Sequence, residues 1–169
     1  MNWEAIGAVG EIIGAIAVVA TLGYLARQMR QANLHAKSQA RQRMIEQAQD
    51  ELYQIVNDPS IHELFVRDGS LEPDEQVKLN AYLASFLRQR EWEWFQYRDG
   101  ILDKSTFESY YSVIALLLGT ERTHRWWKRI GKSGFNESFV DEVDELLGSA
   151  GLSPYMHEIR SWDDAPDEK

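Results

Sequence analysis

The chain has 169 residues, no cysteine and a formal net charge of −9. The lack of cysteine excludes disulfides and thiolate metal sites, and it fits a reducing compartment such as the cytoplasm. The negative charge argues against a dedicated nucleic-acid-binding protein, which is usually basic. The length suffices for one membrane segment and one compact domain.

The first segment is almost wholly apolar from Ala5 to Ala26, a run of 22 residues. A helix needs about 20 such residues to cross a hydrocarbon core of about 30 Å. The chain starts Met1-Asn2-Trp3-Glu4, which is acidic, whereas a secretory signal peptide starts with a basic region. We therefore expect a transmembrane helix over residues 1–28; the alternative is a buried helix of a soluble protein.

Basic residues follow this run and none precedes it. The positive-inside rule then places the N-terminus outside and the rest of the chain in the cytoplasm. Of these residues, Arg27, Arg30 and Lys37 are the candidates for contact with anionic lipid headgroups.

The remainder of the chain is predicted to be helical. No Gly or Pro occurs between Tyr24 and Asn57, so residues 3–57 are expected to form one helix of roughly 80 Å, with residues 29–57 as a stalk. Gly and Pro punctuation predicts the helices of a cytoplasmic bundle over residues 58–148, namely Ser60–Asp68, Pro73–Arg98, Lys104–Leu118, Thr120–Lys132 and Asn136–Leu147. No segment alternates with period 2, so no sheet is expected.

The predicted fold class is therefore all-α: an N-terminal transmembrane helix that continues as a long stalk helix, packed with a cytoplasmic helical bundle. Residues 149–169 contain two prolines and several acids and are expected to form an acidic, weakly ordered tail.

One face of the predicted span is small and polar. In seven-residue steps Glu4 and Glu11 fall on one line, and Gly7, Gly14 and Thr21 fall on the next. Gly10 and Gly14 also form a GxxxG pattern, which permits close helix approach in membranes. The opposite face carries Ile and Val and is expected to meet lipid. The small face is the candidate intramembrane interface or pore lining.

Glu11 is costly in lipid, by about 2.5–3.5 kcal/mol even on lenient insertion scales. Three interpretations remain open: it fixes helix pairing, it belongs to a ring of carboxylates facing a hydrated lumen, or it snorkels to the outer surface. The first two need partner helices, and a parallel homo-oligomer supplies them most simply.

Candidate chemistry in the bundle is sparse. Glu121 and His124 have the Glu-x-x-His spacing of half a di-iron site, but no second such pair exists. There is no phosphate-binding loop and no nucleophile motif. We therefore predict no catalytic residues, no metal, no cofactor and no enzymatic activity.

Two aromatic clusters are candidates for a pocket or an interface. Trp94 and Tyr97 lie in the first, for which an aromatic core rimmed by i,i+3 and i,i+4 ion pairs is the favoured interpretation. Arg125, Trp126 and Trp127 lie in a basic helix that is followed at once by an acidic one. Pairing of these two helices is favoured over contact of the basic helix with lipid.

Several motifs carry a resemblance to a known group. They are Gly7-Ala8-Val9-Gly10-Glu11-Ile12-Ile13-Gly14, Tyr24-Leu25-Ala26-Arg27-Gln28, Tyr97-Arg98-Asp99-Gly100-Ile101-Leu102-Asp103, Arg125-Trp126-Trp127 and Phe139-Val140-Asp141-Glu142-Val143-Asp144. In these the chain resembles a widespread group of uncharacterised bacterial membrane proteins of about this length. The resemblance implies a single-span helical protein of the bacterial inner membrane, and it implies no activity.

The function expected from the sequence is a homo-oligomeric single-span membrane protein that acts as a scaffold or pore-like assembly with an intramembrane Glu ring. The alternative is a membrane-tethered module that binds a cytoplasmic ligand or acts as a stress or defence effector.

Overall fold

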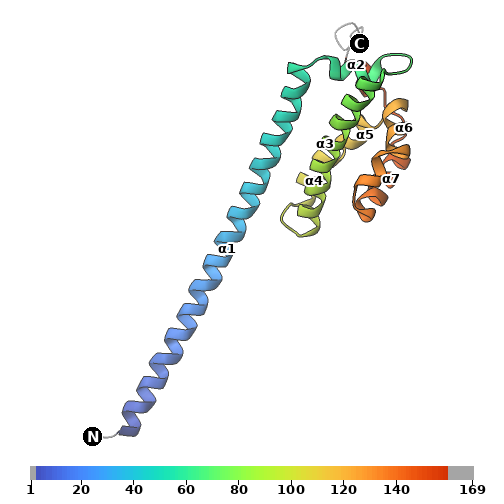
Figure 1. Cartoon of the computed structure of the whole chain (residues 1–169). Helices are drawn as coiled ribbons and strands as arrows, with labels where there is room; N and C mark the ends of the chain where they lie inside the picture. The colour runs from blue at the N-terminus through green and yellow to red at the C-terminus, as the bar shows by residue number, and fades with distance from the viewer. Residues whose placement is uncertain (1–2, 160–169) are drawn as a thin grey trace, which may run out of the picture. The chain divides into compact units, whose positions relative to one another are not determined.

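The computed structural model describes residues 3–159, and these contain helices and no strand. The elements are α1 (Trp3–Asn57), α2 (Ser60–Val66), α3 (Pro73–Arg98), α4 (Lys104–Tyr111), α5 (Val113–Leu117), α6 (Glu121–Arg129), the 3₁₀ helix η1 (Gly131–Gly134), α7 (Glu137–Ala150) and α8 (Tyr155–Glu158), as Figure 1 shows. The all-α prediction is confirmed, as is the single helix predicted over residues 3–57.

The chain divides into two compact units, one up to Ala40 and one from Arg41 onward. In the first unit α1 stands alone: none of its most apolar stretch is buried within the chain. Among the described residues α1 is the one helix that is long and apolar enough to span a membrane. The length and composition of α1 therefore indicate a possible span.

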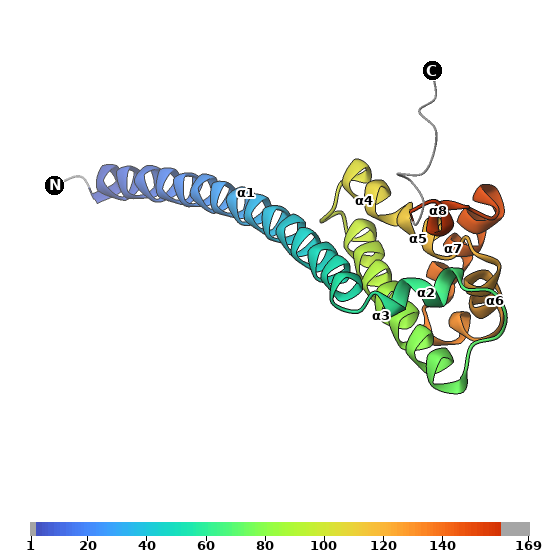
Figure 2. The same ribbon diagram turned by 90° about the horizontal axis from the view of Figure 1, so that it is seen from above.

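The second unit has its own hydrophobic core. Helix α3 contacts α2, α4 and η1, while α5 contacts α7 and α8 (Figures 1 and 2). Large side chains from these helices and from α6 are fully enclosed, among them Leu83, Leu87, Ile114, Trp127 and Phe139. Each full burial of such a side chain stabilises the fold by about 1.5–3 kcal/mol.

Local chemistry explains where the helices begin. Helix α3 begins at Pro73, whose missing N–H costs nothing at that position, and Glu72 and Glu75 form a reciprocal capping box around it. Asp103 accepts a hydrogen bond from the Thr106 N–H at 3.0 Å and so caps α4. Helix α3 ends at Arg98 with Asp99 as its C-cap, and Gly100 follows with a positive φ of 73° that favours glycine.

The structure differs from the expected helices in one central place. The single helix predicted over Lys104–Leu118 is two helices, because Ser112 ends α4 and precedes α5. No Gly or Pro marks this break. It turns the chain so that Phe107 on α4 and Ile114 on α5 both enter the core.

The described part of the expected tail is also more ordered than predicted. Helix α7 continues to Ala150, and α8 buries Met156 to 2 % exposure in the core. The Ser153 N–H donates to the Gly119 carbonyl at 3.1 Å, which ties this segment to the end of α5. An apolar anchor thus outweighs the polar composition around it. The rest of the tail, residues 160–169, lies outside the described residues.

Candidate functional site

The small face of α1 is free of contacts from the chain itself. A Cβ placed on Gly7, Gly10 or Gly14 would meet nothing within 4 Å. The side chains of Glu4 and Glu11 are exposed on the same helix. These glycines are therefore not required by packing within the chain.

Thr21 satisfies its own hydroxyl. Its Oγ1 donates to the Ala17 carbonyl at 2.8 Å, one turn back along α1. This bond is the usual way in which a threonine is accommodated in an apolar helix. The small hydroxyl therefore adds to the narrow face of α1 at little polar cost.

A buried charge network joins the later part of α1 to α3. Arg90 is 2 % exposed and donates through Nη2 to both carboxylate oxygens of Glu51, at 3.0 and 3.1 Å. Its Nη1 lies 3.3 Å from the carboxylate of Glu93, which is 1 % exposed. The guanidinium also lies over the ring of Phe86, 4.8 Å from its centroid. One cation thus serves two carboxylates in the interior.

Burial governs the protonation of these two acids. It raises the pKa of Glu93, and the positive charge of Arg90 opposes part of that rise. Burial also raises the pKa of Glu51, again opposed by Arg90. The network therefore carries one more potential negative charge than positive charge. The Arg90 Nε is buried and has no hydrogen-bond partner among the described residues.

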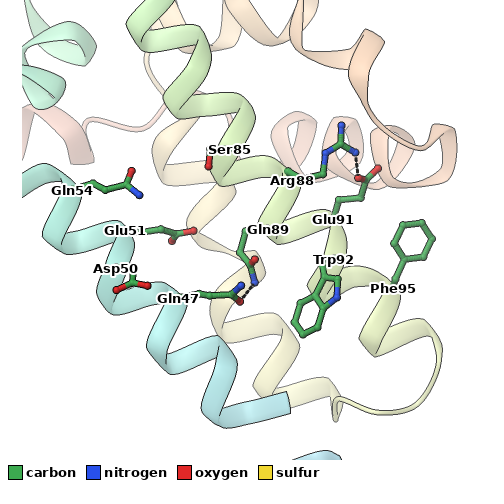
Figure 3. Close-up of a pocket in the computed structure, with 10 residues that line it drawn as sticks. All are labelled: Gln47, Asp50, Glu51, Gln54, Ser85, Arg88, Gln89, Glu91, Trp92 and Phe95. Atoms are coloured by element: carbon green, nitrogen blue, oxygen red, sulfur yellow. Dashed lines mark hydrogen bonds and ion pairs between the residues drawn. The ribbon is translucent and has the colours of Figure 1, made fainter. Parts of the chain in front are cut away.

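Beside this network lies an open groove of about 660 Å³ between α1 and α3. Figure 3 shows Gln47 and Glu51 on α1 facing Gln89 on α3, and Gln89 bonds to Gln47. Trp92 and other apolar atoms form its lower wall. The groove therefore offers amide and carboxylate groups beside one indole ring.

Arg88 and Glu91, which also line this groove, hold the loop before α7. Arg88 pairs with Glu91 and donates to the Gly134 carbonyl at 2.6 Å. Glu91 accepts from the backbone N–H of Asn136 at 2.6 Å. These contacts fix the start of α7 against α3.

The first predicted aromatic cluster is part of the core. Trp94 is 3 % exposed and meets Phe139 edge-on, with ring centroids 6.0 Å apart. Tyr97 stacks on Phe107 at 4.4 Å with nearly parallel rings. The favoured interpretation of an aromatic core agrees with these contacts, but Arg90 and Glu93 lie inside it and not on its rim.

The second cluster is split between core and surface. Trp127 is fully buried and its Nε1 donates to Asp144 at 2.9 Å. Trp126 is half-buried and donates to Asn80 at 3.0 Å. It lines a cavity of about 280 Å³ together with Arg125 and Arg129. Trp94 and Trp127 both belong to the hydrophobic core.

The basic helix α6 does pair with the acidic helix α7 within the chain. Lys132, just after α6, forms an ion pair with Asp144 on α7. Burial alone would raise the pKa of Asp144, but the hydrogen bonds from Lys132 and Trp127 outweigh it and lower that pKa. The favoured interpretation of helix pairing therefore holds for this contact.

One arginine of α6 donates to three backbone carbonyls near the end of α2. Arg122 donates to the carbonyls of Leu64, Arg67 and Gly69, at 2.5, 2.6 and 2.7 Å. Leu64 lies in the last turn of α2, Arg67 is its C-cap residue and Gly69 lies in the loop beyond, where backbone carbonyls have no partner within the helix. Arg122 therefore closes α2 from a distant part of the sequence.

The Glu121–His124 pair gains no further ligands. The described residues contain no group of three or more acidic or histidine side chains placed to hold a metal ion. Burial lowers the pKa of His124, and the nearby charge of Lys128 adds to that effect.

The Arg90 network and the groove beside it were not identified from the sequence. A signal existed, because Arg90 lies seven residues after Leu83 and four before Trp94, on the apolar stripe of α3. A charged residue on such a stripe is buried only when it is paired. Its partner Glu51 lies 39 residues earlier, and no local pattern points to it.

No protein-family model, no curated protein and no solved structure matches this chain.

Proposed function

We propose that this chain is a single-span membrane protein that assembles with copies of itself through the small face of α1, as a scaffold or a pore-like assembly. The observation that carries the proposal is the set of three glycines on a helix face without intrachain contacts. The all-α fold with an apolar first helix agrees with it.

Nothing within the chain requires glycine at the three positions on this face of α1. Glycine within a helix costs about 1 kcal/mol relative to alanine. Gly7, Gly10 and Gly14 do not adopt a positive φ, so the backbone does not require them. Close approach of a second helix gives such residues a use, because it allows two backbones to pack together in lipid.

Glu11 supports the same proposal. A carboxyl group in lipid is stabilised by a hydrogen bond from a neighbouring helix or by a hydrated lumen. Both arrangements require several copies of α1, because this chain has one candidate span among its described residues. The first corresponds to a scaffold and the second to a pore.

The proposed location is the bacterial inner membrane, with the N-terminus outside and the second unit in the cytoplasm. The basic residues that follow the apolar run support this orientation. Arg27, Arg30 and Lys37 would then reach anionic headgroups on the cytoplasmic side. The resemblance to bacterial single-span proteins supports the choice of membrane.

The experiment compares the mass of the full chain in mild detergent with that of three variants, by light scattering after size exclusion. Gly10→Leu and Glu11→Leu should lower the oligomeric mass, because each obstructs or removes the contact. Ile12→Leu, on the opposite face, should leave the mass unchanged and serves as the control. A monomeric wild type, or equal mass in all variants, contradicts the proposal. Ion flux in liposomes that disappears in Glu11→Leu would identify the pore.

The cavity beside Trp126 favours a second candidate function, a membrane-tethered module for an anionic ligand. Its wall contains Arg122, Arg125 and Arg129, and no Asp or Glu lines it. A panel of nucleotides and inorganic phosphate, titrated while tryptophan fluorescence is followed, tests this function. The change in tryptophan fluorescence on ligand addition should vanish in the Trp126→Phe variant. The oligomeric mass of this variant should equal that of the wild type.

A further inference from the structure

Helix α1 has two different faces within the second unit. Met44 is fully buried, and Glu51 and Ile55 are turned toward α3 and the core. The other face is apolar but open to solvent: Ile45 is 51 % exposed and Leu52 is 64 % exposed. The core of this unit thus uses one side of α1 and leaves a second apolar side uncovered.

The exposed apolar residues form a regular stripe. Ile45, Gln49, Leu52 and Val56 follow one another in steps of four, three and four residues. This is the spacing of the a and d positions at which helices of a coiled coil meet. Val56 is the most exposed of the three apolar members of this stripe, at 70 %.

The stripe lies in register with the small face proposed to assemble in the membrane. Steps of seven residues from Gly10 arrive at Ile45 and Leu52, and steps of seven from Gly14 arrive at Val56. A strict seven-residue repeat keeps one helix face toward a partner along a left-handed supercoil. The glycines of that face and the apolar stripe therefore belong to the same two lines of the sequence, whereas the line of Glu4 and Glu11 leads to Glu46 and Tyr53.

The charge pattern favours an identical partner. In a parallel homo-oligomer each seam residue meets its own copy, so a charge on the seam would face a like charge. Every charged residue from Arg27 to Glu51 stands off the two seam lines: Arg27, Arg30, Lys37, Arg41, Arg43, Glu46, Asp50 and Glu51. The seam itself offers only uncharged side chains there and one histidine, His35.

We propose that the stripe of Ile45, Leu52 and Val56 binds the same stripe of a second copy as a parallel coiled coil. This inference rests on the proposed function, which places copies in one membrane with the same orientation and so brings their stripes to the same height. It adds an aqueous contact surface to the intramembrane one. The stripe lies on a different face of α1 from the one that contacts α3. Assembly through the stripe therefore does not compete with the fold of the second unit.

The chain suits a test by disulfide cross-linking, because it has no cysteine of its own. Single variants Ile45→Cys and Leu52→Cys are oxidised in the full-length protein within isolated membranes. A disulfide needs Cα atoms about 4.4–6.8 Å apart, a separation that seam positions provide and outer positions do not. The off-seam controls are Arg43→Cys and Asn57→Cys, both at exposed sites of the same helix.

The expected result is a band of twice the monomer mass that is several-fold stronger for the two seam variants than for the two controls. Gly14→Cys, in the apolar part of α1, separates this proposal from the proposed function. If Gly14→Cys cross-links and the seam variants do not, the stripe proposal is overturned and membrane assembly stands. If none cross-links, self-assembly itself fails. Cross-linking to a band of another mass, or equal yields at all positions, also overturns the proposal.

Discussion

Arg90 on α3 donates to both carboxylate oxygens of Glu51 on α1, at 3.0 and 3.1 Å. The two residues are 39 positions apart, and Arg90 is 2 % exposed. The bond connects the last part of α1 to α3 within the second unit. Since a buried charge needs its partner, the unit is sensitive to substitution of either residue of this pair.

Arg90→Met should destabilise the second unit by roughly 3–5 kcal/mol, because it leaves Glu51 and Glu93 close together without a cation. Thermal unfolding of the full chain, followed by circular dichroism in detergent, measures the loss. Arg43→Met is the matched control, since Arg43 is exposed and no hydrogen bond or ion pair to it is found among the described residues. Equal melting temperatures for the two variants would contradict the assigned role of Arg90.

The Glu93→Gln variant should become more stable to unfolding, relative to the wild type, as the pH rises. Burial raises the pKa of Glu93 above the 4.5 of an ordinary glutamate. A raised pKa means that the folded state binds the proton more tightly, so this contribution to stability is full below 4.5 and is lost as the pH rises through the folded pKa. Glutamine cannot ionise and escapes that loss.

The measurement is the difference in melting temperature between Glu93→Gln and the wild type from about pH 4 to about pH 8. The difference should grow as the pH rises above 4.5 and should level off above the folded pKa of Glu93. Glu46→Gln, at an exposed site of α1, gives the baseline. A difference that shrinks with pH would mean that Arg90 dominates over burial at Glu93.

Gly119→Ala should destabilise the fold, whereas Gly148→Ala should not. A Cβ on Gly119 would lie 2.6 Å from the Ser153 Cβ and 2.7 Å from the Ala115 carbonyl oxygen, neither of which is the end of a flexible side chain. A Cβ on Gly148 meets nothing within 4 Å, and alanine is favoured over glycine in a helix by about 1 kcal/mol. Urea unfolding of both variants should give shifts of opposite sign. Shifts of the same sign would contradict the close contact of Gly119 with the segment before α8.

Trp127→Phe should cost about 2–4 kcal/mol, because it opens a cavity in the core and removes the hydrogen bond to Asp144. Trp92→Phe is the control, since Trp92 is half-buried at the groove. Urea midpoints of the two variants provide the comparison. A larger loss for Trp92→Phe would show that the groove, and not the aromatic core, limits stability.

The sequence predicted the helices that local chemistry defines. Pro73 and Gly100 flank α3, and the predicted bounds of that helix are the observed ones. The uninterrupted run before Asn57 predicted α1 for the same reason. The break at Ser112 was missed because it depends on how Phe107 and Ile114 reach a shared core, which is a property of the packed unit.

The candidate sites divide in the same way. The glycine face of α1 could be derived from spacing, because residues on one helix keep a fixed register. The placement of Trp127 in the core and of Trp126 at the surface could not, since adjacent residues of a helix point about 100° apart and the neighbouring helices decide which side is enclosed. Glu51 was missed because its partner Arg90 lies on another helix.

The contacts of Arg122 bear on the order in which the protein is made. The carbonyls that it closes, at Leu64, Arg67 and Gly69, are synthesised 53 to 58 residues before it. At about 5–20 residues per second, Arg122 is synthesised several seconds after the end of α2. During that time the three carbonyls lack its hydrogen bonds. By then all of α1 has already been made. A nascent chain stalled before Arg122 should therefore have a complete first helix and an unfinished body.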